Sequence, residues 1–167
     1  MEAKTNEAKT NDLNTAIVLE GKQYIVVKIG TEQYGIDIQY VDNIVRMQSI
    51  TRVPKAQHYF KGVINLRGEI IPVMSLRLKF GLEQDQFTNS TRIIIIKLEA
   101  QATIGIIVDE VKEVVTLNEE EIDKPSYNEN DEKASYLFGV GKHGNSLISL
   151  LNIAGVIVEK EKEKTNM

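Results

Sequence analysis

The feature that most constrains the fold is a weak internal repeat with a fixed spacing. Residues 35–45 resemble residues 105–115 at a constant offset of 70 positions, without a gap. In each copy a β-branched run ends and three apolar residues follow at i, i+3 and i+4, namely Val41, Ile44 and Val45, and Val111, Val114 and Val115. This spacing predicts one apolar face on a helical turn. The repeat indicates two similar small β units related by a rough two-fold, with a groove between the turns; the alternative is that any two strand-to-turn segments look alike.

The rest of the sequence is dominated by short strand patterns. β-Branched and aromatic runs separated by turn residues predict strands at 23–29, 33–38, 93–96, 103–108, 138–142 and 147–150. The run at 93–96 is continuous, which is typical of a strand buried on both faces. Pro72 inside an apolar run predicts an edge strand or a bulge. Asn152 can cap a C-terminal helix that runs to Val158, although Gly155 weakens it. Short strands with little helix favour small barrels or a sandwich.

Composition and charge exclude several classes of function. The net charge is −4, from 20 basic and 24 acidic residues, whereas a nucleic-acid binder needs clustered Lys and Arg. The absence of cysteine excludes disulfides, thiol chemistry and cysteine-ligated zinc. His58 and His143 lie in loop-like sequence without a metal-ligand spacing, so both are expected at the surface. No Gly-rich phosphate loop and no nucleophile with a nearby base is visible, so the sequence predicts a protein that is not an enzyme and has no cofactor or metal.

The ends of the chain suggest a simple organisation. Residues 1–16 contain an exact repeat of Glu-Ala-Lys-Thr-Asn, which predicts a disordered leader. Residues 17–158 are expected to form a single domain made of two β subdomains, and residues 159–167 a charged tail. The polar N-terminus lacks a signal peptide, and no apolar run approaches the roughly 20 residues of a membrane helix, so we expect a cytoplasmic protein.

The most specific motif lies at residues 62–73. Two apolar runs flank a polar centre from Asn65 to Glu69, where Arg67 stands beside Gly68. The segment supplies no nucleophile, base or metal ligand. It therefore points to a surface that holds a partner rather than one that turns over a substrate.

The order of several motifs resembles the CheW family of bacterial chemotaxis coupling proteins. The resemblance covers residues 18–158 and is carried by Tyr34-Gly35-Ile36-Asp37-Ile38, Val53-Pro54-Lys55, Gly62-Val63-Ile64-Asn65-Leu66-Arg67-Gly68, Leu76-Arg77-Leu78-Lys79-Phe80-Gly81 and Gly105-Ile106-Ile107-Val108-Asp109-Glu110-Val111. It implies a mainly β fold of two intertwined five-stranded SH3-like β-barrel subdomains, with a few short helices and a C-terminal helix. It also implies a non-enzymatic adaptor that joins the cytoplasmic tips of methyl-accepting chemoreceptors to the regulatory domain of the histidine kinase CheA. Such a protein would be recruited to membrane receptor arrays without inserting into the membrane.

Other functions stay open from the sequence. The kinase's own regulatory domain and the fused adaptor CheV are also similar, although this chain is too short to carry a receiver domain. A CheW-like module of another signalling system is one alternative. A small barrel that binds a ligand or RNA is another, but such barrels need exposed aromatics in a basic groove, and only 6% of this chain is aromatic.

The resemblance further implies where a receptor tip would bind. A hydrophobic groove between the barrels would receive it, and the matching positions are Ile25, Ile38, Val41, Ile44 and Val111. Core packing is an equal alternative for Ile25 and Ile38, whereas the groove is favoured for Val41 and Val111.

A second set of positions matches an interface with kinase or receptor, namely Asn43, Gly62 and Arg67. Many relatives carry a glutamate where Asn43 stands; if that glutamate pairs with the arginine, Asp42 is the expected substitute here. An internal salt bridge is the alternative role for Arg67, and a backbone requirement such as positive φ or close approach is the alternative for Gly62.

Overall fold

The computed structural model describes residues 21–98, 102–124 and 133–157. The strands are β1 (Lys22–Ile29), β2 (Glu32–Asp37), β3 (Val41–Arg46), β4 (Phe60–Leu66), β5 (Glu69–Ser75), β6 (Arg92–Lys97), β7 (Thr103–Val108), β8 (Glu110–Leu117), β9 (Ile122–Asp123), β10 (Leu137–His143) and β11 (Ser146–Leu151). Short helical segments are η1 (Ile38–Tyr40), α2 (Leu76–Lys79), η3 (Glu119–Glu121), α3 (Lys133–Tyr136) and α4 (Ile153–Ile157). The predicted fold class is confirmed, since the chain is mainly β with a few short helices.

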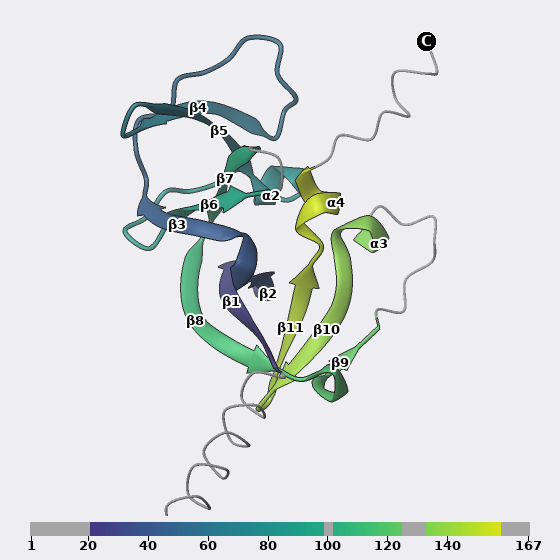
Figure 1. The fold of residues 1–167 in the computed structure, drawn as a ribbon. Helices are drawn as coiled ribbons and strands as arrows, with labels where there is room; N and C mark the ends of the chain where they lie inside the picture. Colours follow the sequence, from purple (N-terminus) through teal and green to yellow (C-terminus); the bar gives the residue numbers. More distant parts are fainter. Residues whose placement is uncertain (1–20, 99–101, 125–132, 158–167) are drawn as a thin grey trace, which may run out of the picture.

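Two sheets share the strands of both halves of the sequence. One sheet has the order β8-β1-β2-β11-β10-β9 and the other the order β3-β6-β7-β5-β4. Figure 1 shows the second sheet above the first, with β3 and β8 beginning where the two meet. The chain leaves the first sheet after β2 and returns to it with β8. The two subdomains are therefore intertwined, as predicted.

The internal repeat is visible in the strand registers. Gly35 lies opposite Val26 and Leu150, and Gly105 lies opposite Ile95 and Val73. The register shifts repeat as well. They occur between Val41 and Asn43 in the β3–β6 pair, between Val26 and Val27 in the β1–β8 pair, between Phe60 and Gly62 in the β4–β5 pair, and between Leu137 and Gly139 in the β10–β11 pair. The structure thus has two similar β units, in agreement with the sequence prediction.

The helical turn predicted at each repeat is wrong, because both segments are strands. Along β3 the exposure alternates, so Val41 and Val45 are partly buried and Ile44 is exposed. The register shift between Val41 and Asn43 adds one residue to β3, so Val41 and Ile44 lie opposite Ile96 and Ile94 of the shared cluster, whereas Val45 packs against the local one. Because of this bulge, positions i and i+3 share a face in the strand as they would in a helix, so the spacing alone could not separate the two. The β-branched residues decide it, because they favour an extended backbone.

The core has one shared part and one part for each subdomain. β1 is buried on both faces, since Ile25 and Val27 enter the shared cluster while Tyr24 and Val26 enter a cluster within the first subdomain. β6 does the same in the second subdomain: Ile94 and Ile96 join the shared cluster, and Ile93 and Ile95 join the local one. The prediction that the 93–96 strand is buried on both faces is confirmed.

Two local predictions have mixed outcomes. β5 is not an edge strand, but Pro72 pairs only with Val63 of β4, because the pairing with β7 begins at Val73. Val63 exchanges both of its backbone hydrogen bonds with Thr51, so the missing N–H of Pro72 breaks no bond to β4. The C-terminal helix is confirmed over Ile153–Ile157.

Several expected segments lie outside the described residues: the leader at 1–16, Val158 at the end of the predicted helix, and the tail at 159–167. Among the residues that are described, no helix has the length and apolarity to cross a bilayer.

Candidate partner-binding surface

The predicted groove residues divide into buried and accessible positions. Ile25 is 4% exposed and packs in the shared core, which is the alternative weighed for it. Ile38 and Ile44 are more than a third exposed. Val41 and Val111 are half-buried, and both pack against the shared core cluster. Four of the five positions therefore have accessible apolar atoms.

The repeat adds one residue to this set. Val114 is the repeat equivalent of Ile44, and it is 52% exposed on β8, opposite Ile25. Sequence analysis placed Val114 in the repeat but not in the site, although the repeat itself carried the signal. We call the accessible set the β3–β8 surface; its members are Ile38, Val41, Ile44, Val111 and Val114.

Arg67 occupies a strained position at the tip of the β4–β5 hairpin. Its φ is 54° and that of Gly68 is 86°, so both central residues of the two-residue turn are left-handed. The Gly68 N–H donates to Asn65 Oδ1 at 2.9 Å and fixes the turn. A left-handed conformation costs a non-glycine residue about 1–2 kcal/mol. Arg67 is exposed and forms no ion pair with any residue in the described ranges. The internal salt bridge considered as its alternative role is therefore not formed within those ranges.

The expectation that Asp42 pairs with Arg67 is wrong. Asp42 lies 3.9 Å from Lys97 Nζ on the neighbouring strand β6. The Asn43 side chain accepts a hydrogen bond from the Ile44 N–H at 2.8 Å. The reason is topological, because β3 and β4 are at opposite edges of their sheet and the Arg67 turn belongs to β4.

Gly62 meets both backbone requirements that the sequence suggested as its alternative role. Its φ is 139°, and a Cβ built on it would lie 2.1 Å from the carbonyl oxygen of Thr51. The two N–H···O bonds between Thr51 and Val63, each 2.8 Å long, hold the strands at this separation.

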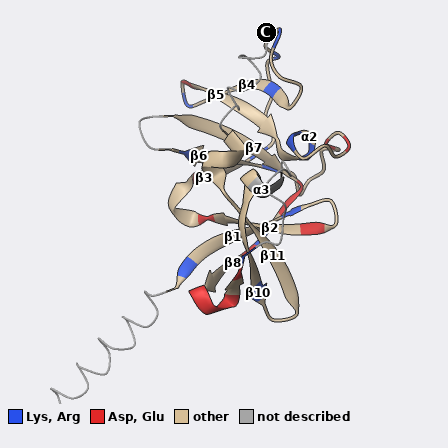
Figure 2. Ribbon diagram, turned by 90° about the vertical axis from the view of Figure 1, so that its right-hand side faces the viewer, with Lys and Arg blue, Asp and Glu red and all other residues tan. Residues whose placement is uncertain are grey.

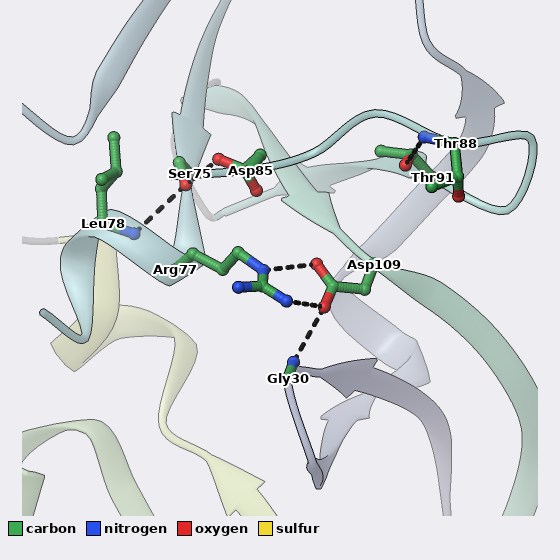
Figure 3. A network of polar contacts seen from close by, with 8 residues as sticks. All are labelled: Gly30, Ser75, Arg77, Leu78, Asp85, Thr88, Thr91 and Asp109. Atoms are coloured by element: carbon green, nitrogen blue, oxygen red, sulfur yellow. Dashed lines mark hydrogen bonds and ion pairs between the residues drawn. The ribbon is translucent and has the colours of Figure 1, made fainter. Parts of the chain in front are cut away.

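An ion-pair clamp joins the two subdomains close to β8 (Figure 3). Arg77 Nε donates to Asp109 Oδ1 at 2.8 Å and Arg77 Nη2 donates to Oδ2 at 2.6 Å, while the Gly30 N–H donates to Oδ2 at 2.8 Å. The clamp therefore ties the β1–β2 turn, α2 and the residue that precedes β8. Arg77 and Asp109 both lie within the motifs that carry the family resemblance, but no sequence pattern connects them, because 32 residues separate them.

The charge state of the clamp follows from its contacts. Burial alone would raise the pKa of Asp109, but the hydrogen bonds from Arg77 and Gly30 and the positive charges of Arg77 and Lys28 hold that pKa below its ordinary value. The hydrogen bond with Asp109 raises the pKa of Arg77. The pair is therefore ionised at neutral pH, and it orients β8 against the first sheet.

The histidines and the acidic residues do not form a reaction centre in the described part of the chain. His58 and His143 are exposed, as predicted. No group of three or more His, Asp or Glu residues within the described ranges is placed to hold a metal ion. Figure 2 shows acidic residues gathered at the η3 end of the molecule, while the ribbon of the sheets is mostly free of charged residues.

These features define a class of protein: a β module that presents exposed aliphatic side chains and an exposed arginine without an ion pair in the described ranges, which suits the binding of a partner. Residues 23–161 match the family described as the CheW-like domain, and the chain belongs to this family. It is 33% identical to the chemotaxis protein CheW of Bacillus subtilis over 90% of this chain and 96% of that protein. It is 32% identical to the chemotaxis protein CheW of Klebsiella aerogenes over 84% of each chain. The crystal structure of the scaffolding protein TtCheW from Thermoanaerobacter tengcongensis is similar with a TM-score of 0.72 and 34% identity, over 79% of this chain and 89% of that chain.

Proposed function

We propose that this protein is a non-enzymatic scaffold in bacterial chemotaxis that couples the cytoplasmic tips of chemoreceptors to the histidine kinase CheA at receptor arrays. The observation that carries the proposal is the match in sequence and fold, over most of the chain, to proteins named CheW and to a structure described as a scaffolding protein. The deciding experiment mixes the full chain separately with a receptor-tip fragment and with the kinase regulatory domain. Saturable binding to both is expected, and binding to neither would reject the proposal.

The receptor tip is assigned to the β3–β8 surface. A helical receptor segment would bury its apolar stripe on Ile38, Val41 and Ile44 from one repeat and on Val111 and Val114 from the other. Recognition of a helix by an apolar surface depends on a few aliphatic anchors spaced along the helix, and the paired positions supply them from two strands. The clamp at Asp109 supports this assignment, because it holds β8 in place relative to the other subdomain.

Substitution of Val41 by lysine tests this assignment. The half-buried position packs against the shared core, so binding would have to desolvate an ammonium without a partner. We expect receptor-fragment affinity to fall by about 1–3 kcal/mol, or roughly 5- to 150-fold, with little change in kinase binding. Leu147→Lys is the matched control, because Leu147 is 64% exposed on the distant β10–β11 hairpin. The affinity should be measured by calorimetry and expressed per folded molecule. If a folded Val41→Lys protein has wild-type affinity, Val41 is not part of the site.

Arg67 is assigned to a contact with the kinase or the receptor. A forked guanidinium can donate two hydrogen bonds to a carboxylate or to carbonyl oxygens of a partner. Its strained backbone supports the proposal, because glycine or asparagine would suit the turn better.

The Arg67→Gly variant should therefore change stability and binding in opposite directions. Relief of the left-handed arginine should raise the free energy of unfolding by about 0.5–1 kcal/mol. Loss of the guanidinium should weaken binding to one partner about tenfold, whereas Arg67→Lys keeps the charge and the strain and should lose less. Urea unfolding and calorimetry with each fragment give the two readouts. Unchanged affinity for both partners in Arg67→Gly would show that the side chain is not a contact.

A further inference from the structure

A hollow of about 310 Å³ has a lining that includes none of the residues of the β3–β8 surface. It is bounded by the β1–β2 turn, by the end of α2 and by the junction of α3 and β10. Its lining consists of Ile29, Gly30, Thr31, Glu32, Tyr34, Arg77, Phe80, Leu82, Glu83, Tyr136 and Leu137. None of the residues assigned to receptor or kinase binding belongs to this lining. Its volume lies at the lower end of the range for small-ligand pockets.

Three aromatic rings form one wall of the hollow. The ring centroids of Tyr34 and Phe80 are 5.3 Å apart, and those of Phe80 and Tyr136 are 5.6 Å apart. Aromatic faces carry partial negative charge and attract cations that lie over them. One ring of this wall already has a cation nearby, because Lys79 Nζ lies 5.7 Å from the centroid of Tyr136; the same ammonium lies 4.0 Å from the centroid of Tyr59, which is outside the lining.

Carboxylates make the mouth of the hollow negative. Glu32 and Glu83 are exposed lining residues, and the Tyr34 hydroxyl donates to Glu32 Oε2 at 2.9 Å, which ties that carboxylate to the aromatic wall. Arg77, the one cation among the described lining residues, is engaged with Asp109. The pKa of Arg77 is raised first by its hydrogen bond with Asp109 and also by the nearby charges of Asp109, Asp85 and Glu83. An anionic ligand would therefore meet an excess of negative charge.

The walls are held in place before any ligand arrives. The Gly30 N–H and Arg77 are both bound to Asp109, so the turn and the helix cannot separate without breaking the clamp. At the end of α2 the left-handed Gly81, with φ of 76°, turns the chain, and the Leu82 N–H donates to the Arg77 carbonyl at 2.8 Å. The 43% exposed Leu82 is thereby placed in the lining.

We propose that this hollow is a binding site for an organic cation, with an ammonium or guanidinium group carried on an apolar stem. The aromatic wall and the aliphatic side chains would take the stem, and Glu32 and Glu83 would face the charge. An arylalkylamine fits this description, and so does the side chain of a lysine or arginine presented by a protein. Because walls from both subdomains meet here, an occupant would also stabilise their relative orientation.

The test is a titration of the ¹⁵N-labelled full chain followed by backbone amide chemical shifts. The probes are 4-phenylbutylamine, 4-phenylbutan-1-ol and 4-phenylbutyrate, which differ in charge but little in shape. The amine should cause saturable shifts at Gly30, Thr31, Gly81 and Leu82, the alcohol should bind about tenfold more weakly, and the anion should bind more weakly still. Equal or tighter binding of the anion, or the absence of saturable shifts with the amine, would overturn the proposal.

Charge-neutral variants separate the site from the overall charge of the protein. Glu32→Gln combined with Glu83→Gln should weaken the amine about tenfold and leave the alcohol unchanged. The control, Glu69→Gln combined with Glu113→Gln, removes the same charge from exposed positions outside the lining and should change neither. If both double variants weaken amine binding equally, the effect comes from the overall charge of the protein, and the proposal of a defined site is rejected.

Two peptides then identify the source of the cation. Blocked Ala-Leu-Arg-Leu-Ala and its glutamine analogue should be titrated alongside the free amine. Tighter binding of the arginine peptide than of the amine, at the same amides, assigns the site to a protein partner. Binding of the amine alone assigns it to a small molecule. Both outcomes support the cation site, while saturable binding of the two peptides with equal affinity contradicts it.

Discussion

Replacing Gly62 by alanine is expected to lower the free energy of unfolding by about 3 kcal/mol or more. A methyl group at this position would lie 2.1 Å from Thr51 O, 2.7 Å from Thr51 C and 2.9 Å from Ile50 Cγ2. Two of these atoms belong to the Thr51 backbone. The paired hydrogen bonds between Thr51 and Val63 hold this backbone in place, so it cannot easily move away from the added methyl group. The positive φ of 139° adds strain for any residue with a Cβ. Overpacking against a fixed backbone belongs to the small set of changes with unusually large effects.

Two other glycines provide matched controls in urea unfolding experiments. Gly68 also has a positive φ, 86°, but nothing lies within 4 Å of its virtual Cβ, so Gly68→Ala should cost only about 1 kcal/mol. Gly139 occupies the position equivalent to Gly62 in the repeat, but its nearest neighbour is the side-chain atom Ile122 Cγ2, which can move. If Gly62→Ala lowers the free energy of unfolding no more than Gly68→Ala does, the close approach of the Thr51 backbone is not the reason that position 62 requires glycine. If the remaining folded Gly62→Ala protein binds both partners normally, Gly62 acts through the fold rather than through direct contact.

The strands and their repeat could be predicted because they depend on local pattern. β-Branched runs such as Ile93 to Ile96 define buried strands, and the constant offset between Gly35 and Gly105 identifies equivalent strands in the two units. The exchange of β3 and β8 between the subdomains was implied only by the family resemblance. No local sequence pattern determines which sheet a strand joins.

Side-chain partners could not be predicted in the same way. Asp42 lies at a register shift next to Lys97, and only the edge positions of β3 and β4 show why Arg67 is out of its reach. The clamp joins Arg77 and Asp109 from segments that are brought together by the parallel pairing of β5 with β7. Neither residue is unusual in its local sequence, so the pair becomes visible only in three dimensions.

The intertwined topology links the binding surface to the clamp. The β3–β8 surface takes its residues from strands that belong to different sheets, so its shape depends on how the two subdomains are held together. Asp109 directly precedes β8, and Arg77 is on the helix that follows β5. If the β3–β8 surface binds the receptor tip as proposed, a change in the clamp should therefore alter receptor binding without any contact to the receptor.

Asp109→Asn is expected to lower the free energy of unfolding at pH 7 by about 2 kcal/mol. This is less than the loss of a fully buried pair, because about a quarter of each side chain is exposed, at 23% for Arg77 and 25% for Asp109. The matched control is Asp123→Asn, which removes an ion pair with Lys142 whose side chains are 61% and 62% exposed. Such an exposed pair contributes about 0–1 kcal/mol.

The difference between wild type and Asp109→Asn should depend on pH in one direction. Because the pKa of Asp109 is lower in the folded protein than its ordinary 3.8, the unfolded chain binds its proton first as the pH falls. The stabilisation is therefore fully present above about pH 5 and is lost progressively below about pH 4, as the pH falls toward the folded-state value. Urea unfolding of both proteins from pH 7 down to about pH 2.5 should show their stabilities converging at the acid end. A difference that stays constant over this range would mean that Asp109 acts through packing, and that its ionised contact with Arg77 does not hold the subdomains together.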